Sequence, residues 1–165
     1  MEFHERVHPR LKGYDYGTNG VYFLTICSRD MEQLFCRILA RTIDTPFVEL
    51  TDIWICVDNT IEHLKQKNHA VTIENYVIMP NHVHMLLVVN DMGGGASGKP
   101  RPTNAAIPVL VSSLKRYTNK VCAAELWQDG YYDHIIRDEN DLLIHWQYIE
   151  NNPAKWAEDK YYAYS

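Results

Sequence analysis

Long apolar runs are missing from the sequence. No stretch of about 18 consecutive apolar residues occurs, which excludes a membrane-spanning helix on sequence grounds. The first residues, MEFHERVHPRLKGYDYG, also lack the apolar segment of a secretory signal. We therefore expect a cytoplasmic protein that has no membrane partner.

Closely spaced cysteines are missing, since no C-x-x-C pair occurs. The four cysteines are Cys27, Cys36, Cys56 and Cys122, each beside apolar or helix-forming residues. Cysteine-type zinc clusters require closely spaced thiols. We expect all four to be reduced thiols in the core.

Internal repeats are also absent. A chain of 165 residues that is 46% hydrophobic is long enough for one ordinary domain and too short for two. We therefore expect residues 1–165 to form a single domain. Residues 91–104, DMGGGASGKPRPTN, hold four glycines and two prolines, and we expect them to form a flexible connector within that domain.

Acidic residues are missing from residues 92–124, although the whole chain carries a net charge of −5. Phosphate neutralisation supplies most non-specific affinity for nucleic acids, so the overall charge argues against such a partner. The local excess of positive charge still allows a basic face that binds nucleic acid. The alternative is a solvated surface that is basic by chance. The five cations of this region give it a charge of +5, so the rest of the chain carries a net charge of −10. They are Lys99, Arg101, Lys115, Arg116 and Lys120.

Apolar patterning and capping signals predict the order of the elements. Strands are expected at 21–27, at 46–50, in two halves of 70–89 around Met-Pro-Asn, and at 134–137; helices are expected at 52–67 after Thr51, at 105–125 and at 138–151. Pro108 is tolerable only in the first turn of its helix, and Pro153 closes the last one. This order implies an α+β sandwich of the ferredoxin-like kind, with helices packed on an antiparallel or mixed sheet.

The second helix is expected to be amphipathic. Its polar side should carry Lys115, Arg116, Asn119 and Lys120. The residues expected to face the core are Val109, Leu110, Leu114, Tyr117 and Val121.

The segment His82-Val83-His84 places two imidazoles two residues apart. On a strand this spacing points both rings to one face, where two neutral imidazoles can share a metal ion. The alternative is a pair of partly buried, hydrogen-bonded histidines without a metal.

The last predicted helix carries two stripes. Leu142, Trp146 and Ile149 form an apolar stripe that should pack, and the neighbouring stripe is polar. On the polar stripe, Tyr148 and Asn152 lie four residues apart and should project side by side. The alternative for Tyr148 is a half-buried amphipathic filler, because the chain has eleven tyrosines.

Four segments in order carry a family resemblance: YFLTICSR, YVIMPNHVHMLLVV, LWQDGYYDHIIRDENDL and WQYIENNPAKW. Together they resemble the REP-associated tyrosine transposases, relatives of the small insertion-sequence transposases of the single-tyrosine His-hydrophobe-His (HUH) type. The resemblance spans roughly residues 10–157, nearly the whole chain.

The resemblance implies an activity and a site. It implies a metal-dependent single-strand DNA endonuclease and strand transferase that acts on single-stranded or hairpin DNA, with Mg²⁺ or Mn²⁺ as cofactor, as a monomer or homodimer. It places the metal ligands at His82 and His84 and the nucleophile, which becomes linked to a 5′ phosphate, at Tyr148. The third ligand falls on Asn152, where mobile members of the family often have the longer Gln.

Several residues are expected to contact DNA. Exposed bases could stack on aromatic rings, and phosphates could run along a basic helix face. For the aromatic residues the alternative is packing in the core. The expected DNA-binding residues are Lys115, Arg116, Lys120, Trp127, Tyr131, Tyr132 and Arg137.

Two other functions remain open from the sequence. One is a protein that binds DNA hairpins but has lost its chemistry, which the shorter Asn152 and the acidic net charge both allow. The other is a metal-dependent enzyme or regulator of a different class, in which His82 and His84 serve a small-molecule site.

Overall fold

The computed structural model describes residues 20–40, 46–89 and 106–162. Its central sheet has four strands in the order β4-β5-β1-β6, and every neighbouring pair is antiparallel. The expected α+β sandwich is therefore confirmed, with a wholly antiparallel sheet in the described part of the chain. The strands are β1 (Gly20–Cys27), β4 (Val71–Ile78), β5 (His82–Val89) and β6 (Tyr132–Ile136).

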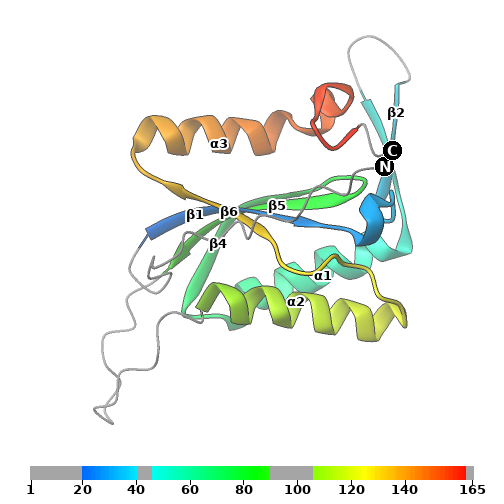
Figure 1. The fold of residues 1–165 in the computed structure, drawn as a ribbon, viewed down its shortest axis with the longest axis horizontal. Helices are drawn as coiled ribbons and strands as arrows, with labels where there is room; N and C mark the ends of the chain where they lie inside the picture. The colour runs from blue at the N-terminus through cyan, green and yellow to red at the C-terminus, as the bar shows by residue number, and fades with distance from the viewer. Residues whose placement is uncertain (1–19, 41–45, 90–105, 163–165) are drawn as a thin grey trace, which may run out of the picture.

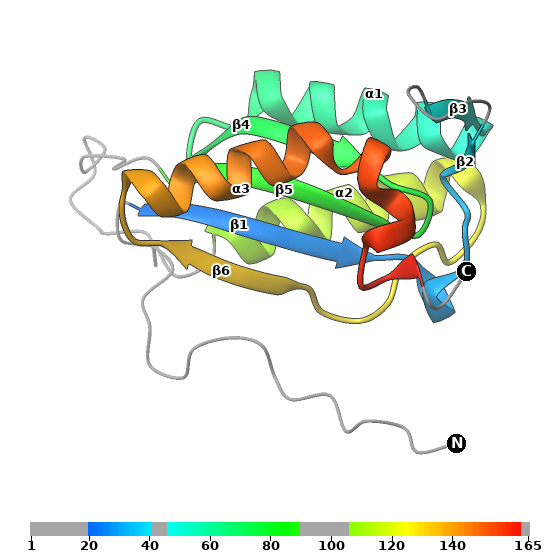
Figure 2. The same ribbon diagram turned by 90° about the horizontal axis from the view of Figure 1, so that it is seen from above.

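The helices cover both faces of this sheet. Helices α1 (Asp52–Lys67) and α2 (Ala106–Cys122) lie on one face, and α3 (Glu139–Asn151) lies on the other (Figure 1). After α3 the short helix η3 (Pro153–Glu158) turns back over the end of β1 (Figure 2).

A small second sheet stands at the same end of the molecule as η3 (Figure 2). It pairs β2 (Cys36–Ala40) with β3 (Pro46–Leu50), which confirms the short extended piece expected at 46–50. A single helical turn, η1 (Arg29–Met31), leads into it from β1.

The helix starts follow from their capping residues. The Thr51 hydroxyl accepts a hydrogen bond from the Trp54 amide at 3.1 Å, and the Asp138 carboxylate accepts one from the Asp141 amide at 2.8 Å. Each side chain satisfies an amide that the first helical turn leaves unpaired. The predicted starts of α1 and α3 are therefore confirmed.

The two faces of β5 have different environments because successive side chains alternate across a strand. Val83, Met85 and Leu87 are buried in the core under α1 and α2. His82 and His84 point to the opposite face, toward α3. This alternation puts the histidine pair between the sheet and the last helix.

The predicted core face of α2 is partly wrong. Val109, Tyr117 and Val121 are each 56% exposed, whereas Leu110 and Leu114 are buried as expected. The helix has apolar residues on more than one side, and the buried side is the one that also carries Thr118. The Thr118 hydroxyl accepts a hydrogen bond from the Trp127 indole at 2.8 Å. The buried residues of α2 are Ile107, Leu110, Val111, Leu114 and Thr118.

The remaining expectations about the chain have different outcomes. All four cysteines carry thiols rather than disulfides; Cys27 and Cys36 are buried, and Cys56 and Cys122 are partly buried. The connector expected at 91–104 lies outside the described residues. Within the described ranges, no helix is both long and apolar enough to cross a membrane.

Candidate metal and nucleophile site

The rings of His82 and His84 lie side by side on β5. Their centroids are 4.4 Å apart, and the residues are 0% and 1% exposed. They pair across the sheet with Cys27 and Thr25 of β1. The sequence prediction that both rings share one face is confirmed.

A neighbouring amide fixes the tautomer of His82. The Asn81 amide nitrogen donates to the carbonyls of Met31 (3.3 Å) and Tyr161 (3.1 Å), which turns its oxygen toward Nδ1 of His82 at 2.8 Å. An amide oxygen only accepts, so Nδ1 carries the proton. Nε2 is left with a lone pair and, within the described part of the chain, without a hydrogen-bond partner.

His84 is also held at Nδ1, by a hydroxyl. Its Nδ1 lies 2.8 Å from the hydroxyl of Thr25 on the neighbouring strand. Its Nε2 is buried and finds no hydrogen-bond partner among the described residues. A metal-binding histidine typically has one ring nitrogen held by such a partner and the other directed at the ion.

Burial keeps both imidazoles neutral. Burial, helped by the nearby Lys160 charge, lowers the pKa of His82 to about 3. Burial also holds the pKa of His84 well below its ordinary value. Neutral imidazole is the form that binds a metal, so the pair is ready to bind one at neutral pH.

Helix α3 brings Tyr148 to this pair. Trp146 and Ile149 pack against the sheet as predicted. The Tyr148 ring, on the next stripe, lies 5.2 Å from the His84 ring centroid. Burial and then the Asp159 charge raise the pKa of the Tyr148 phenol to about 12, which the Asn152 side chain partly opposes.

Asn152 occupies the C-cap of α3, four residues after Tyr148. It is 3% exposed, and apart from its approach to the Tyr148 hydroxyl neither its amide oxygen nor its amide nitrogen makes a hydrogen bond of good geometry to a described residue. A buried amide without partners costs free energy unless a ligand satisfies it.

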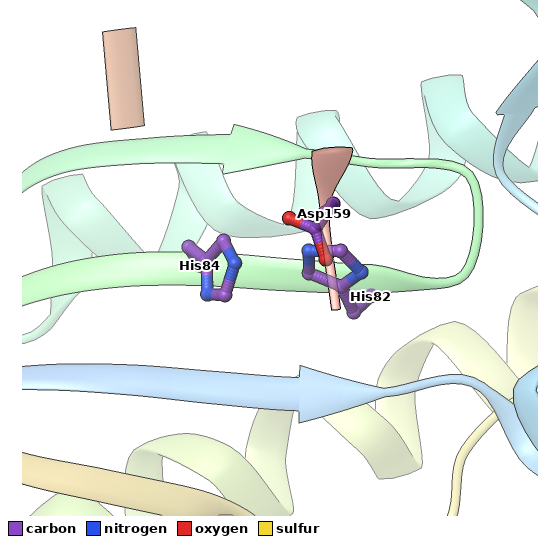
Figure 3. A group of neighbouring side chains, drawn as sticks. All are labelled: His82, His84 and Asp159. Atoms are coloured by element: carbon purple, nitrogen blue, oxygen red, sulfur yellow. The ribbon is translucent and has the colours of Figure 1, made fainter. Parts of the chain in front are cut away.

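Asp159 is a member of the site that the sequence did not predict. One oxygen of its carboxylate and one ring nitrogen of each histidine, His82 and His84, lie within 4.8 Å of one another (Figure 3). Its Oδ2 accepts a hydrogen bond from the Tyr148 hydroxyl at 3.0 Å, and its Oδ1 accepts one from the Tyr161 amide at 2.8 Å. Its place depends on the backward turn of η3, for which the sequence carries no periodic signal.

The segment after α3 covers the histidines. The Tyr161 ring lies 4.5 Å from the His82 ring, and the Trp156 ring lies 6.0 Å from it. Tyr148, 38% exposed, reaches an outer groove of about 550 Å³. This groove is also lined by Gln147, Asn152, Lys155, Asp159 and Lys160. The nucleophile candidate thus stands between an open groove and a closed histidine pair.

The donor set fits a divalent cation. The unpartnered ring nitrogens of His82 and His84 lie together with the Asp159 carboxylate, and the buried Asn152 amide oxygen at the end of α3 is a further candidate donor. Mixed nitrogen and oxygen sets with open positions suit Mn²⁺ or Mg²⁺, and also zinc.

The aromatic residues expected to stack on bases lie in different environments. Trp127 and Tyr131 are 6% and 5% exposed and belong to the core, so neither ring has a face open to a base. The core-packing alternative holds for these two. Tyr132 is 44% exposed, and its pairing with Thr25 places it on the α3 face of the sheet.

The basic residues expected at a DNA interface are also spread out. Arg116 and Lys120 are exposed and line a groove of about 580 Å³ on α2, on the opposite side of the sheet from Tyr148 (Figure 1). The Lys115 ammonium instead donates to the carbonyls of Gln128 and Gly130. Arg137 is exposed just before α3.

Comparison with known proteins gives three informative relatives, although no family model matches the chain. An uncharacterised protein of Haemophilus influenzae is 32% identical over 174 residues, covering 96% of this chain and 94% of its own length. A second Haemophilus influenzae protein, provisionally named as a REP-associated tyrosine transposase, is 24% identical, covering 86% of this chain and 74% of its own. A solved REP-associated tyrosine transposase bound to a REP hairpin has the same fold, with TM-score 0.59 and 22% identity over 97% of this chain and 77% of that one.

The fold and the site together define a class of protein: an antiparallel α+β sandwich in which a His-hydrophobe-His pair faces a tyrosine on a helix. The chain belongs to one family with the first Haemophilus influenzae protein, and it is similar to the REP-associated tyrosine transposases.

Proposed function

We propose that this protein is a metal-dependent single-strand DNA endonuclease and strand transferase that acts on hairpin DNA through a 5′-phosphotyrosine intermediate. One observation carries the proposal. The Tyr148 ring lies 5.2 Å from the ring of His84, one of two buried histidines whose Nε2 atoms lack hydrogen-bond partners among the described residues. A nucleophile candidate thus adjoins two potential metal donors, an arrangement that suits metal-assisted attack on a phosphodiester.

His82, His84 and Asn152 would hold the divalent cation, Mn²⁺ or Mg²⁺. When bound, this ion supplies Lewis-acid stabilisation of the negative charge that develops on the phosphate oxygens. The protein residues contribute neutral nitrogens from β5 and a buried amide oxygen from the end of α3. Asn81 accepts from Nδ1 of His82 and so leaves the Nε2 lone pair of that ring directed into the site, and the Thr25 hydroxyl holds the Nδ1 side of His84.

Tyr148 would be the nucleophile. Its pKa of about 12 means that the phenol is protonated at neutral pH, so attack requires that the proton leave. The Asp159 carboxylate already accepts the phenol's hydrogen bond at 3.0 Å and is placed to receive that proton. Asp159 would then act beside the metal ligands rather than replace Asn152 among them.

The bond changes balance without an external energy source. The Tyr148 oxygen attacks phosphorus, the bond from phosphorus to the 3′ oxygen breaks, and that oxygen takes up one proton, equal to the one the phenol gave to Asp159, and leaves as a 3′ hydroxyl. The 5′ phosphate stays on Tyr148, so the energy of the diester is retained. A second 3′ hydroxyl can attack this linkage, restore the phenol and join a new strand.

The nucleic acid would be single-stranded or hairpin DNA. The solved relative with the same fold is bound to a REP hairpin, which supports this partner. Tyr132 lies on the α3 face, where a single strand would pass Tyr148, and Arg137 precedes α3. Arg116 and Lys120 lie across the sheet and would contact a duplex stem or DNA held by a second subunit of a homodimer.

A labelled hairpin oligonucleotide with Mn²⁺ tests the proposal on a denaturing gel. The wild-type protein should form a covalent protein–DNA adduct, and Tyr148→Phe should form none while it still shifts the hairpin on a native gel. Tyr117→Phe is the matched control, because Tyr117 is exposed on the far side of the sheet, and its adduct should equal the wild type. An undiminished adduct in Tyr148→Phe would contradict the assigned nucleophile.

A protein that binds hairpins without chemistry is a second candidate. The closed state of the site favours it, because His82 and His84 are 0% and 1% exposed and Asp159 engages the Tyr148 hydroxyl. The same experiment separates the two: a hairpin shift with no adduct in the wild type, at any Mn²⁺ concentration, supports the silent binder.

A further inference from the structure

A second cluster of metal-binding side chains lies at the other end of α3. It joins His134 of edge strand β6 to Asp141 and His145, which are one helical turn apart on α3. One ligand atom from each residue lies within 4.8 Å of the other two. Neither the resemblance to transposases nor the proposed reaction uses these residues.

The contacts inside this cluster are short. His134 Nε2 lies 3.0 and 2.9 Å from the two Asp141 carboxylate oxygens. His145 Nδ1 lies 3.1 Å from Asp141 Oδ1 and 2.9 Å from the Asp141 carbonyl. The two imidazole rings are stacked, with centroids 4.5 Å apart and an interplanar angle of 18°.

We propose that His134, Asp141 and His145 form a binding site for a zinc ion, separate from the His82–His84 pair. Two imidazoles and one carboxylate are a common three-ligand zinc set, which leaves the fourth tetrahedral position to water. Zinc suits this set because its four-coordinate sites commonly combine two imidazoles with one carboxylate, whereas Mg²⁺ keeps six ligands that are mostly oxygens and water.

The spacing of the donors suits this ion. With Zn–N and Zn–O bonds of about 2.0 to 2.2 Å, neighbouring donor atoms of a tetrahedron are about 3.3 Å apart. The contacts from Asp141 to the two rings are 2.9 to 3.1 Å, so these donors need to move apart by only a few tenths of an ångström. Small rotations of surface side chains provide such shifts.

The ion can enter from solvent. The His134 side chain is 43% exposed, and those of Asp141 and His145 are 19% and 20% exposed. Hydrogen bonds from the His134 ring and the Arg137 amide lower the pKa of the Asp141 carboxyl further below its ordinary value, so it is an anionic ligand at neutral pH. Zinc binds the neutral form of each ring at the nitrogen that faces Asp141, so the single ring proton moves to the opposite nitrogen.

Occupation of this site would fasten α3 to the sheet. The nucleophile candidate Tyr148 lies one turn beyond His145. Phe23 of β1 also contacts both the histidine pair and the proposed zinc site. Its ring centroid lies 5.0 Å from that of His84 and 4.6 Å from that of His145. Zinc bound between β6 and α3 would therefore restrict the helix that positions Tyr148 against the histidine pair.

Zinc titration of the chelator-treated full chain by isothermal calorimetry tests the proposal. The titrated protein is the double variant His82→Ala/His84→Ala. It lacks the other pair of histidine donors, so any zinc that it binds reports on the remaining site. We expect this protein to bind one zinc ion. Adding His134→Gln, or independently Asp141→Asn, should weaken that binding by about 100-fold or more, since each removes a direct ligand.

His63→Gln in the same background is the matched control, because His63 is an exposed histidine on α1, across the sheet. It should leave the affinity unchanged, and the metal-free melting temperatures of all variants show whether each is folded. Absence of a stoichiometric zinc ion in the folded double variant would overturn the proposal and leave a hydrogen-bonded cluster only. Retention of the ion in both His134→Gln and Asp141→Asn would overturn it as well. These outcomes do not depend on whether the protein cleaves DNA.

Discussion

The hydroxyl of Tyr148 donates a hydrogen bond to Oδ2 of Asp159 at 3.0 Å. This contact joins the final helix to the segment that follows it, and both meet over the same two histidines. Asp159 lies within 4.8 Å of their ring nitrogens, as a metal ligand would, yet it also engages the nucleophile candidate. Mutation of Asn152 and of Asp159 can therefore show which of the two is the third metal ligand.

Metal affinity separates these two oxygen donors. We predict that Asn152→Ala weakens Mn²⁺ binding by about 10- to 100-fold, whereas Asp159→Ala changes it by no more than a few-fold. Apart from its approach to the Tyr148 hydroxyl, the buried Asn152 amide makes no hydrogen bond of good geometry in the described chain, so its removal should not unfold the protein. Calorimetric titration with Mn²⁺ measures both affinities. The opposite ranking would make Asp159 the third ligand.

The hydroxyl of Thr25 should matter to the metal although it cannot touch it. Thr25→Val keeps the shape of this buried residue but removes the partner of His84 Nδ1, which frees the ring to rotate or change tautomer. We expect about a 10- to 100-fold loss of Mn²⁺ affinity. Thr60→Val is the control: Thr60 is equally buried, and its hydroxyl donates to the Cys56 carbonyl within α1. An equal loss in both variants would assign the effect to folding.

Stability of the metal-free protein should fall in acid. Burial lowers the pKa of His82 to about 3 in the folded state and also holds that of His84 well below its ordinary value, near 6.5. Between pH 6.5 and about 4 the unfolded chain therefore binds protons that the folded chain excludes, so the free energy of unfolding decreases as pH decreases. The expected slope is about 1 kcal/mol per pH unit for each histidine.

Urea unfolding across this pH range, in the presence of a chelator, measures that slope. The double variant His82→Gln/His84→Gln lacks both titrating groups, so its profile should be flatter over the same interval. Equal slopes in the two proteins would mean that other groups dominate the acid response.

Salt dependence tests the basic face of α2. Arg116 and Lys120 are exposed beside a groove, and neutralising both as Arg116→Gln/Lys120→Gln should weaken hairpin binding. If both contact phosphates, the slope of log affinity against log salt should fall by about 2. Lys65→Gln/Lys67→Gln on α1 is a control of equal charge. Equal effects of the two double variants would indicate a general charge effect.

Local signals predicted most of the fold. The Thr51 and Asp138 caps marked the starts of α1 and α3, and alternation on β5 correctly placed His82 and His84 on one face. The packed face of α2 was harder, because a helix with apolar residues on two sides has no unique inward stripe. Only contacts with distant segments, such as the Thr118 to Trp127 hydrogen bond, select one.

The candidate site was only partly predictable for the same reason. The spacings of the histidine pair and of Tyr148 and Asn152 are local, so the sequence could single them out. Asp159 and the cluster around Asp141 depend on how η3 turns back and how α3 crosses β6. Such long-range placement leaves no periodic trace in the chain.

The identity of the residue joined to DNA is the most direct test of the central claim. A wild-type adduct formed on a hairpin with Mn²⁺ would be digested with protease and nuclease and sequenced by mass spectrometry. The account predicts a nucleotide 5′ phosphate on Tyr148 and none on Tyr132, the exposed tyrosine on the same face of the sheet. A phosphate mapped to Tyr132 or to any other residue would contradict it.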